Sequence, residues 1–202
     1  MNAGDKPAAP VPIDVGIAPI WDRFFAVLPL VLVATREGPS YDIAPKHMAM
    51  PIGWQNHYGF VCTPRHATYQ NVLATETFTV SFPRPEQVAQ IAMAAAPRVD
   101  DAKTGLAALT TSPARVVDGV LVDGCLAYLE CRLERIVDGF GDASLIVGAV
   151  VAASADPAAL RHEERDDADL IHETPLLAYL QPGRIARIDR SSSFPYPEGF
   201  TI

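Results

Sequence analysis

The sequence contains little cysteine. Its three cysteines, Cys62, Cys125 and Cys131, lie inside apolar runs, and no two are spaced as C-x-x-C. Paired cysteines mark disulfide frameworks, redox motifs and zinc sites, so none of these classes is indicated. We interpret the three residues as buried thiols in a reducing cytosol.

Long apolar runs and targeting signals are also absent. No apolar stretch approaches the ~20 residues that a membrane-spanning helix needs. Residues 1–12 are rich in alanine and proline but lack the basic stretch and apolar core of a secretory signal. We therefore expect a soluble, cytoplasmic protein with no membrane partner.

Basic residues are outnumbered, with 16 Lys and Arg against 24 Asp and Glu, a net charge of −8 and a pI near 5.0. General nucleic-acid binding requires cations that displace counterions from phosphates, so we expect no nucleic-acid partner. A locally basic pocket for a small anionic ligand is still compatible with this charge balance.

Several catalytic motifs are missing or incomplete. There is no P-loop and no G-x-S-x-G segment. Gly139–Ser144 begins like a dinucleotide fingerprint, but it lacks the third glycine and leads into a predicted strand. His162–Asp166 begins like a zincin helix but ends in an acid where a histidine must stand. His47, His57 and His66 are too far apart for a local metal motif, although a fold could gather them, and we expect no metal site.

What the sequence does contain is a series of strand patterns with two short helices. The run Phe25–Ala34 fits one strand buried on both faces, and Phe78–Phe82 alternates like a half-buried strand. We expect further strands at 58–62, 127–134, 145–153, 176–180 and 185–188, and a hairpin turn at 138–142. The strand at 145–153 is apolar on both faces, so helices or a partner subunit must cover both.

The predicted helices cover residues 66–75 and the segment from Pro85 to Pro97. The second helix is expected to bury Val88, Ile91, Ala92 and Ala95. The charged stretch 161–173 is expected to form a solvated helix or loop. This order of elements lacks a β-α-β-α rhythm, which favours a mainly β fold: an antiparallel barrel with flanking helices.

The segment Thr63–Asn71 places hydroxyls and a guanidinium at a strand-to-helix junction. Helix N-termini present unpaired N–H groups and partial positive charge, so they hold phosphate well. Arg65 would add a charge-assisted bond, and Thr63 and Thr68 would add neutral ones. The alternative is that Thr63 or Thr68 simply caps a short helix.

The upstream segment Ala44–Trp54 combines two methionines and two prolines with Lys46 and His47. A flat heteroaromatic ring with a polar edge is held by such walls, which offer soft apolar contacts and a few donors. The alternative is a core strand with two side chains that extend to solvent.

These two segments, in this order, resemble the flavin reductase-like family of FMN-binding split barrels. The family has an apolar strand, here Pro29–Thr35, then an Asn-x-Ala-Pro-x-Ser type segment, here Asp42–His47. A strand ending in Ser/Thr-Pro-Arg…Thr-Tyr…Asn follows, here Thr63–Asn71, and then an alternating strand, here Phe78–Phe82. The resemblance continues through 129–131, 145–148, 175–177 and 183–184.

The resemblance implies a split-barrel domain at residues 24–190, between an N-terminal arm (1–23) and a C-terminal tail (191–202). It implies a homodimer with FMN near the interface, the phosphate on Thr63, Arg65 and Thr68, and the ring against residues 46–50. The full set of residues expected to bind FMN is Lys46, His47, Met48, Ala49, Met50, Cys62, Thr63, Pro64, Arg65, Thr68 and Asn71.

Three residues depart from the family pattern. His47 stands where the family has a small hydroxyl residue, so its imidazole would approach the polar edge of the flavin; it is our candidate catalytic residue. Ala143 stands where short NADH-dependent reductases often carry histidine, and Ile185 replaces an aromatic residue. The last two departures weaken the case for a reductase that exchanges FMN rapidly.

The leading hypothesis is an FMN-dependent oxidoreductase, reduced by NADH or NADPH, that passes electrons to free flavin, oxygen or another small acceptor. Lys46 and His47 would tune the flavin. A second hypothesis is a non-catalytic FMN-binding electron carrier or sensor. A third, by fold analogy alone, is heme or pyridoxal phosphate binding on a related split barrel.

Overall fold

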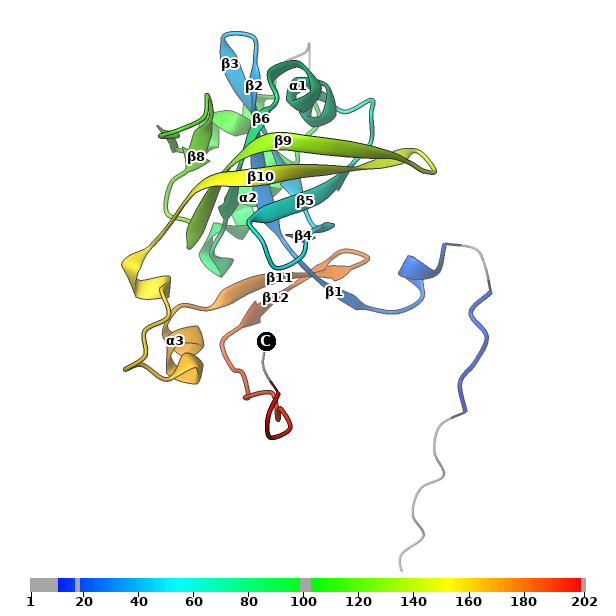
Figure 1. Cartoon of the computed structure of the whole chain (residues 1–202). Helices are drawn as coiled ribbons and strands as arrows, with labels where there is room; N and C mark the ends of the chain where they lie inside the picture. Colours follow the sequence, from blue (N-terminus) through cyan, green and yellow to red (C-terminus); the bar gives the residue numbers. More distant parts are fainter. Residues whose placement is uncertain (1–10, 17–18, 99–102, 201–202) are drawn as a thin grey trace, which may run out of the picture.

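The computed structural model describes residues 11–16, 19–98 and 103–200 of the chain. Its largest element is a seven-stranded antiparallel sheet in the order β3-β2-β6-β9-β10-β5-β4 (Figure 1). The strand bounds are β2 Val31–Glu37, β3 Ser40–Lys46, β4 Ala49–Pro51, β5 His57–Cys62, β6 Thr77–Phe82, β9 Ala127–Phe140 and β10 Ala143–Ala155.

The two edge strands of this sheet, β3 and β4, are consecutive in the chain. Only His47 and Met48 separate them, and the N–H of Val61 in β5 donates to the carbonyl of Met48 at 2.8 Å. A sheet whose edges are joined by two residues must curl until those edges meet. The curled sheet, with its few short helices, confirms the predicted antiparallel split barrel.

A second, three-stranded sheet lies beside one end of the barrel in the order β1-β11-β12 (Figure 1). It consists of β1 Ala26–Pro29, β11 Leu176–Gln181 and β12 Arg184–Ile188, and a separate ribbon consists of β7 Thr111–Pro113 and β8 Val120–Val122. The predicted single strand at 25–34 was therefore wrong. Pro29 has no N–H to donate to a ladder, and the chain changes sheets just after it.

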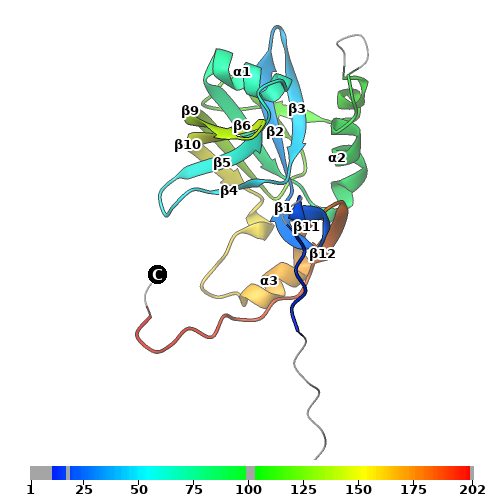
Figure 2. The ribbon, with the colours of Figure 1, turned by 90° about the vertical axis from the view of Figure 1, so that its right-hand side faces the viewer.

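Alternate residues of β2 enter two different cores. Val31 and Val33 face the barrel interior with Phe60, Phe78 and their neighbours, whereas Leu32 and Ala34 face the outer side. The outer core is covered by α2 (Val88–Ala94), which stands beside β3 in Figure 2. The two-sided burial predicted for this part of the run is confirmed.

Strand β6 is more buried than its alternating pattern predicted. Phe78 and Val80 lie in the barrel core, but Thr79 and Ser81 on the other face are also buried. The hydroxyl of Thr79 donates to the carbonyl of Val120 at 2.5 Å, and the hydroxyl of Ser81 accepts from the backbone of β8 at 3.1 Å. The hydroxyl face is therefore covered by β8 and is not open to solvent.

The predicted helices are present with one correction. Helix α1 spans Ala67–Thr75, and α2 follows a short 3-10 turn, η2, at Pro85–Gln87. In α2 the deeply buried residues are Ile91 and Ala94, while Ala92 and Ala95, which we expected inside, are exposed. The short helix buries one residue every third position, so its apolar face is narrower than the sequence pattern suggested.

The long hairpin of β9 and β10 is confirmed, but its turn is tighter than predicted. Phe140 pairs with Ala143, which leaves only Gly141 and Asp142 in the turn. Gly141 has φ +67°, a left-handed conformation that glycine adopts without strain. One face of β10 is not fully covered within the chain, because Val151 is exposed there.

The loop between β7 and β8 is fixed by a buried carboxylate. Glu130 of β9 is 5% exposed and accepts hydrogen bonds from the backbone N–H groups of Arg115, Val116 and Val117. Burial opposes its charge, but these three bonds outweigh burial and lower the pKa of Glu130 below its ordinary value.

The charged stretch at 161–173 contains α3 (Asp167–Glu173), preceded by the 3-10 turn η4 (Pro157–Ala159). The side chain of Asp166 caps α3 by accepting from the N–H of Ala168 at 2.7 Å. The expected solvated segment is thus a helix, although Leu170 is buried.

Two further 3-10 turns are η1 (Ile20–Asp22) and η3 (Thr104–Ala108). The predicted terminal arms lie partly outside the described residues.

Candidate functional site

The link between β3 and β4 lies against the turn that joins β5 to α1. The two segments meet because β4 pairs with β5, with Ala49 opposite Phe60. Between them is a cavity of about 210 Å³. It is lined by Pro45, Lys46, His47, Met48, Val61, Cys62, Thr63 and His66.

A larger cavity of about 490 Å³ adjoins the first, and the two share Pro45, Lys46 and His66. It extends from β3 past the start of α1 to the end of α2. Its lining is Asp42, Ala44, Pro45, Lys46, Arg65, His66, Ala67, Thr68, Ala94, Ala95, Ala96, Pro97, Arg98 and Lys103.

The larger cavity is rich in cationic side chains, although the protein as a whole is acidic. Lys46, Arg65, Arg98 and Lys103 all line it, and among the described lining residues Asp42 is the one acid. The low-dielectric walls of a cleft strengthen the field of such a cluster. This corner is therefore suited to an anion.

Asp42 organises one side of this corner. Its carboxylate is buried and accepts from Arg98 at 3.1 Å, from Lys103 Nζ at 3.2 Å and from the hydroxyl of Thr68 at 3.4 Å. Lys103 also donates to the carbonyl of Ile43 at 2.6 Å. From the sequence, Asp42 stands out only as part of a motif, because this network joins segments far apart in the chain.

Neither threonine acts as the helix cap that we considered as an alternative. The N-cap of α1 is His66, and it makes no side-chain capping bond. Thr63 precedes the helix, and Thr68 lies in its first turn and bonds to Asp42. Arg65 is 72% exposed beside this helix start and pairs with Asp142 of the hairpin turn at 3.4 Å.

His47 contacts an aromatic residue that sequence reasoning missed. Its imidazole packs on the ring of Tyr179, with centroids 4.5 Å apart and planes 31° apart. Tyr179 belongs to β11 of the small sheet, so this contact joins the two sheets at the site. No local pattern signals such a contact, because it depends on how the two sheets pack.

The ionisation of the site favours neutral imidazoles beside a lysine ammonium. Burial, followed by the charge of Lys46, lowers the pKa of His47. Burial and the neighbouring charges of Lys46 and Arg65 likewise lower the pKa of His66. Lys46 Nζ in turn lies 3.4 Å from the sulfur of Cys62 and donates to it.

The structure brings most of the residues predicted to bind the cofactor to these two cavities and leaves four outside them. Lys46, His47, Met48, Cys62, Thr63, Arg65 and Thr68 line one or both cavities. Ala49 is packed in the barrel core, and Met50 is 55% exposed on an edge strand. The carbonyl of Pro64 accepts from Gln70, and the Asn71 amide donates to Thr35 at 3.0 Å.

The donor set fits an anionic phosphate joined to a flat ring. The cationic corner offers guanidinium, ammonium and hydroxyl donors, which suit phosphate oxygens. The smaller cavity offers methionine and proline walls with Lys46 and His47 at the edge, which suit a heteroaromatic ring. Within the described ranges, no three His, Cys, Asp or Glu side chains are grouped to hold a metal ion.

Among the described elements, no helix has the length and apolar character needed to cross a membrane. A search of curated protein sequences found no match. The fold, in contrast, is shared with many solved structures.

Flavoredoxin of Desulfovibrio vulgaris (Miyazaki F) superposes with a TM-score of 0.77 at 18% identity, over 94% of this chain and 100% of that one. The FMN-binding protein from Thermus thermophilus, solved with bound 1-cyclohex-2-enone, superposes with a TM-score of 0.72 at 18% identity, over 92% of this chain and 99% of that one. The NADH:FAD oxidoreductase of Streptomyces globisporus C-1027, solved with NAD and FAD fragments, superposes with a TM-score of 0.64 at 18% identity, over 81% of this chain and 86% of that one. At these identities the likeness shows the fold alone.

The sequence itself also matches a family model. Residues 26–181 match the model of the flavin reductase like domain, which is more than half of the chain. The matched region begins with β1 and ends with β11, so it contains both segments that line the two cavities. The chain therefore belongs to the flavin reductase-like domain family.

Proposed function

We propose that this protein is an FMN-binding oxidoreductase that takes electrons from NADH or NADPH and delivers them to free flavin, oxygen or another small-molecule acceptor. When bound, FMN supplies the hydride- and electron-transfer chemistry, and the protein supplies binding, orientation and electrostatics. The observation that carries the proposal is the cationic corner that continues directly into the cavity beside Lys46 and His47.

In this proposal Arg65 and the N-terminus of α1 hold the phosphate, and Thr68 joins them when its hydroxyl turns from Asp42 to a phosphate oxygen. Arg65 offers charge-assisted bonds, and the helix end adds partial positive charge. Arg98 is paired with Glu37 and Asp42, and Lys103 with Asp42, so these two cations are balanced by acids and the charge offered to the phosphate comes mainly from Arg65.

Lys46 and His47 would lie at the polar edge of the flavin ring, with Met48 at its side. Because the pKa of His47 is lowered, its imidazole is neutral near pH 7 and acts as a hydrogen-bonding group. Lys46 would then supply positive charge at the polar edge of the bound ring. Thr63, the third residue that we expect at the phosphate, lines the same cavity beside Cys62.

We also propose that the protein is a homodimer with FMN near the interface. Apolar side chains are exposed beside the site and on the uncovered face of β10: Met48, Met50, Trp54 and Val151. A second copy would cover them and close the ring cavity. We expect a mass of twice the 21.7 kDa chain in analytical ultracentrifugation. A monomer that still binds FMN tightly would contradict this arrangement.

One observation favours the alternative, a non-catalytic FMN-binding electron carrier. Ala143 directly follows the hairpin turn, where the short NADH-dependent reductases of the family often carry histidine. The hairpin tip therefore offers no imidazole at that position for a nicotinamide.

Stopped-flow reduction of the FMN-loaded protein by NADH and by NADPH distinguishes the two functions. An oxidoreductase would show reduction by one donor that is faster than the reduction of free FMN and saturates with donor concentration. Reduction no faster than that of free FMN with both donors would eliminate the oxidoreductase and leave the carrier.

A further inference from the structure

A third cavity, of about 470 Å³, lies between α3, the junction of β1 and β2, and the ends of β6, β9 and β10. It shares no lining residue with the two cavities of the candidate flavin site. Its lining is Pro29, Leu30, Phe82, Pro83, Leu126, Ala127, Ala155, Ala159, Arg161, Asp167, Leu170, Ile171, Thr174, Leu176 and Leu177.

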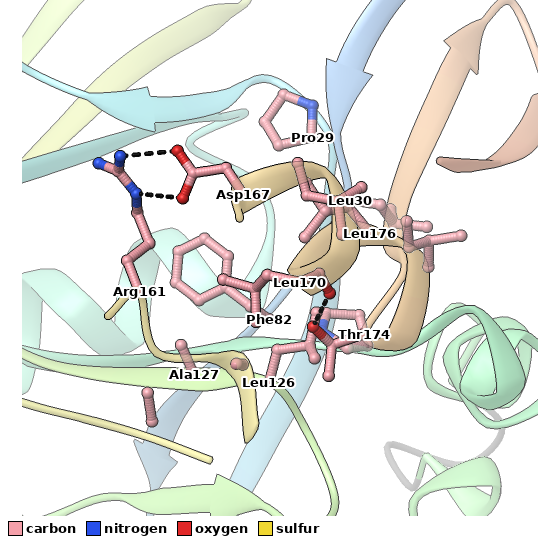
Figure 3. A pocket seen from close by; sticks show the side chains of 15 residues that line it. Pro29, Leu30, Phe82, Leu126, Ala127, Arg161, Asp167, Leu170, Thr174 and Leu176 are labelled. Atoms are coloured by element: carbon pink, nitrogen blue, oxygen red, sulfur yellow. Dashed lines mark hydrogen bonds and ion pairs between the residues drawn. The ribbon is translucent and has the colours of Figure 1, made fainter. Parts of the chain in front are cut away.

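The walls of this cavity are apolar, and the polar group among them is already bonded. Leu126, Leu170 and Leu177 are deeply buried and form its inner surface. The hydroxyl of Thr174 donates to the carbonyl of Leu170 at 2.6 Å, as Figure 3 shows, so it is not available to a ligand. Water needs two to four polar partners to stay in such a space, which favours an apolar occupant.

Charged residues occur only at the rim among the described lining residues, and there they neutralise one another. Both nitrogens of the Arg161 fork bind the carboxylate of Asp167, at 2.9 and 2.7 Å (Figure 3). Because this pair carries no net charge, the rim offers a charged ligand no unpaired partner among the described lining residues.

The volume is in the range of sites that hold small organic molecules, about 300–1,000 Å³. The cavity is bounded by several independent elements, with the ring of Phe82 among its walls (Figure 3). Aromatic and proline side chains offer flat surfaces for a planar ligand.

We propose that this cavity is a second ligand site, separate from the flavin, that binds an uncharged, planar, apolar molecule of about two rings in size. The proposal does not depend on the proposed function, since the two sites have no residue in common.

The test uses the full chain saturated with FMN, and N-phenylnaphthylamine as a neutral, apolar, two-ring probe. Binding is followed by calorimetry, which avoids overlap with flavin absorbance. We expect saturable binding of one probe per chain. We also expect FMN to remain bound throughout the titration.

Two variants fill the cavity from two different elements. Ala159→Phe adds a ring from η4, and Ala127→Leu adds bulk from β9. Each is expected to weaken probe binding at least about tenfold while leaving FMN affinity unchanged. The matched control is Ala158→Phe, because Ala158 is the exposed neighbour of Ala159 outside the lining, and it should bind the probe like the unmodified protein.

Thermal unfolding and FMN binding show whether each variant is folded. If Ala159→Phe does not fold, the folded Ala127→Leu variant still tests whether the probe occupies this cavity. Absence of saturable binding would overturn the proposal. So would unchanged binding in the folded cavity-filling variants, or competition between the probe and FMN, which would place the probe in the flavin site.

Discussion

Replacing Arg65 with alanine should weaken FMN binding while leaving riboflavin binding unchanged. Riboflavin has the same ring but no phosphate, so it cannot lose a phosphate contact. A hydrogen bond to a charged group contributes about 1.5–3 kcal/mol. Arg65 is 72% exposed, so solvent screening places the effect at the lower end of that range, which corresponds to roughly a tenfold weaker Kd for FMN.

The ion pair between Arg65 and Asp142 gives an internal check on this reasoning. In the free protein Asp142 occupies the guanidinium that we assign to the phosphate. Asp142→Asn should release it and tighten FMN binding. An exposed pair contributes at most about 1 kcal/mol, so the gain should not exceed about fivefold. Riboflavin binding should again be unaffected.

The assay is titration of protein into each flavin, followed by quenching of flavin fluorescence. Arg135→Ala is the matched control, because Arg135 is an exposed arginine of β9 that lines none of the cavities. Equal weakening of FMN and riboflavin by Arg65→Ala would show that Arg65 does not contact the phosphate and would place the phosphate elsewhere.

Three further substitutions test the fold and the ionisation of the site. Glu130→Gln should destabilise the protein by about 2–3 kcal/mol in urea unfolding, whereas exposed Glu134→Gln on the same strand should change little; equal effects would contradict the role of the three backbone bonds. Because the folded pKa of Glu130 is lowered, its contribution is present above about pH 4.5 and is lost as the pH falls, so the difference between Glu130→Gln and the unmodified protein should shrink in acid. Gly148→Ala should cost about 1–3 kcal/mol, because its Cβ would lie 2.6 Å from the buried ring of Phe78; an unchanged Tm would show that this ring can move. The pKa of His47 is lowered, so protonation below about pH 6.5 penalises the folded state, and His47→Gln should lose less stability between pH 7 and pH 5; parallel pH profiles would contradict this.

The fold could be predicted from the sequence where local pattern and final burial agree. The α1 segment, the β9–β10 hairpin and the strands β5, β11 and β12 all follow from periodicity. Strand β3 was missed because it contains Pro45 and the charged residues Asp42 and Lys46. An edge strand tolerates proline, and the buried acid is stabilised by cations from distant segments.

The residues of the site were predictable only in part, because some of them meet only through contacts between distant segments. Lys46, His47, Thr63 and Arg65 were found because their segments carry unusual residue combinations. Tyr179 could not be found, because its contact with His47 depends on the packing of two sheets. Ala49 and Met50 were assigned to the ring wall from their position in the chain, but strand alternation directs one into the core and the other outward.

The chain leaves the three-stranded sheet just after Pro29 and enters the seven-stranded sheet with β2, which affects the site. It places β1 and β11 at the end of the barrel, where Tyr179 reaches His47. A single straight strand at 25–34 would not bring the small sheet to this position. The contact between Tyr179 and His47 therefore could not be predicted from a continuous strand at 25–34.

Titration of FMN with the purified protein tests flavin binding most directly. We predict saturable quenching of FMN fluorescence at one flavin per chain and a perturbed visible absorbance spectrum. Protein that is colourless when purified and leaves FMN with its free fluorescence throughout the titration would show that the chain does not bind FMN.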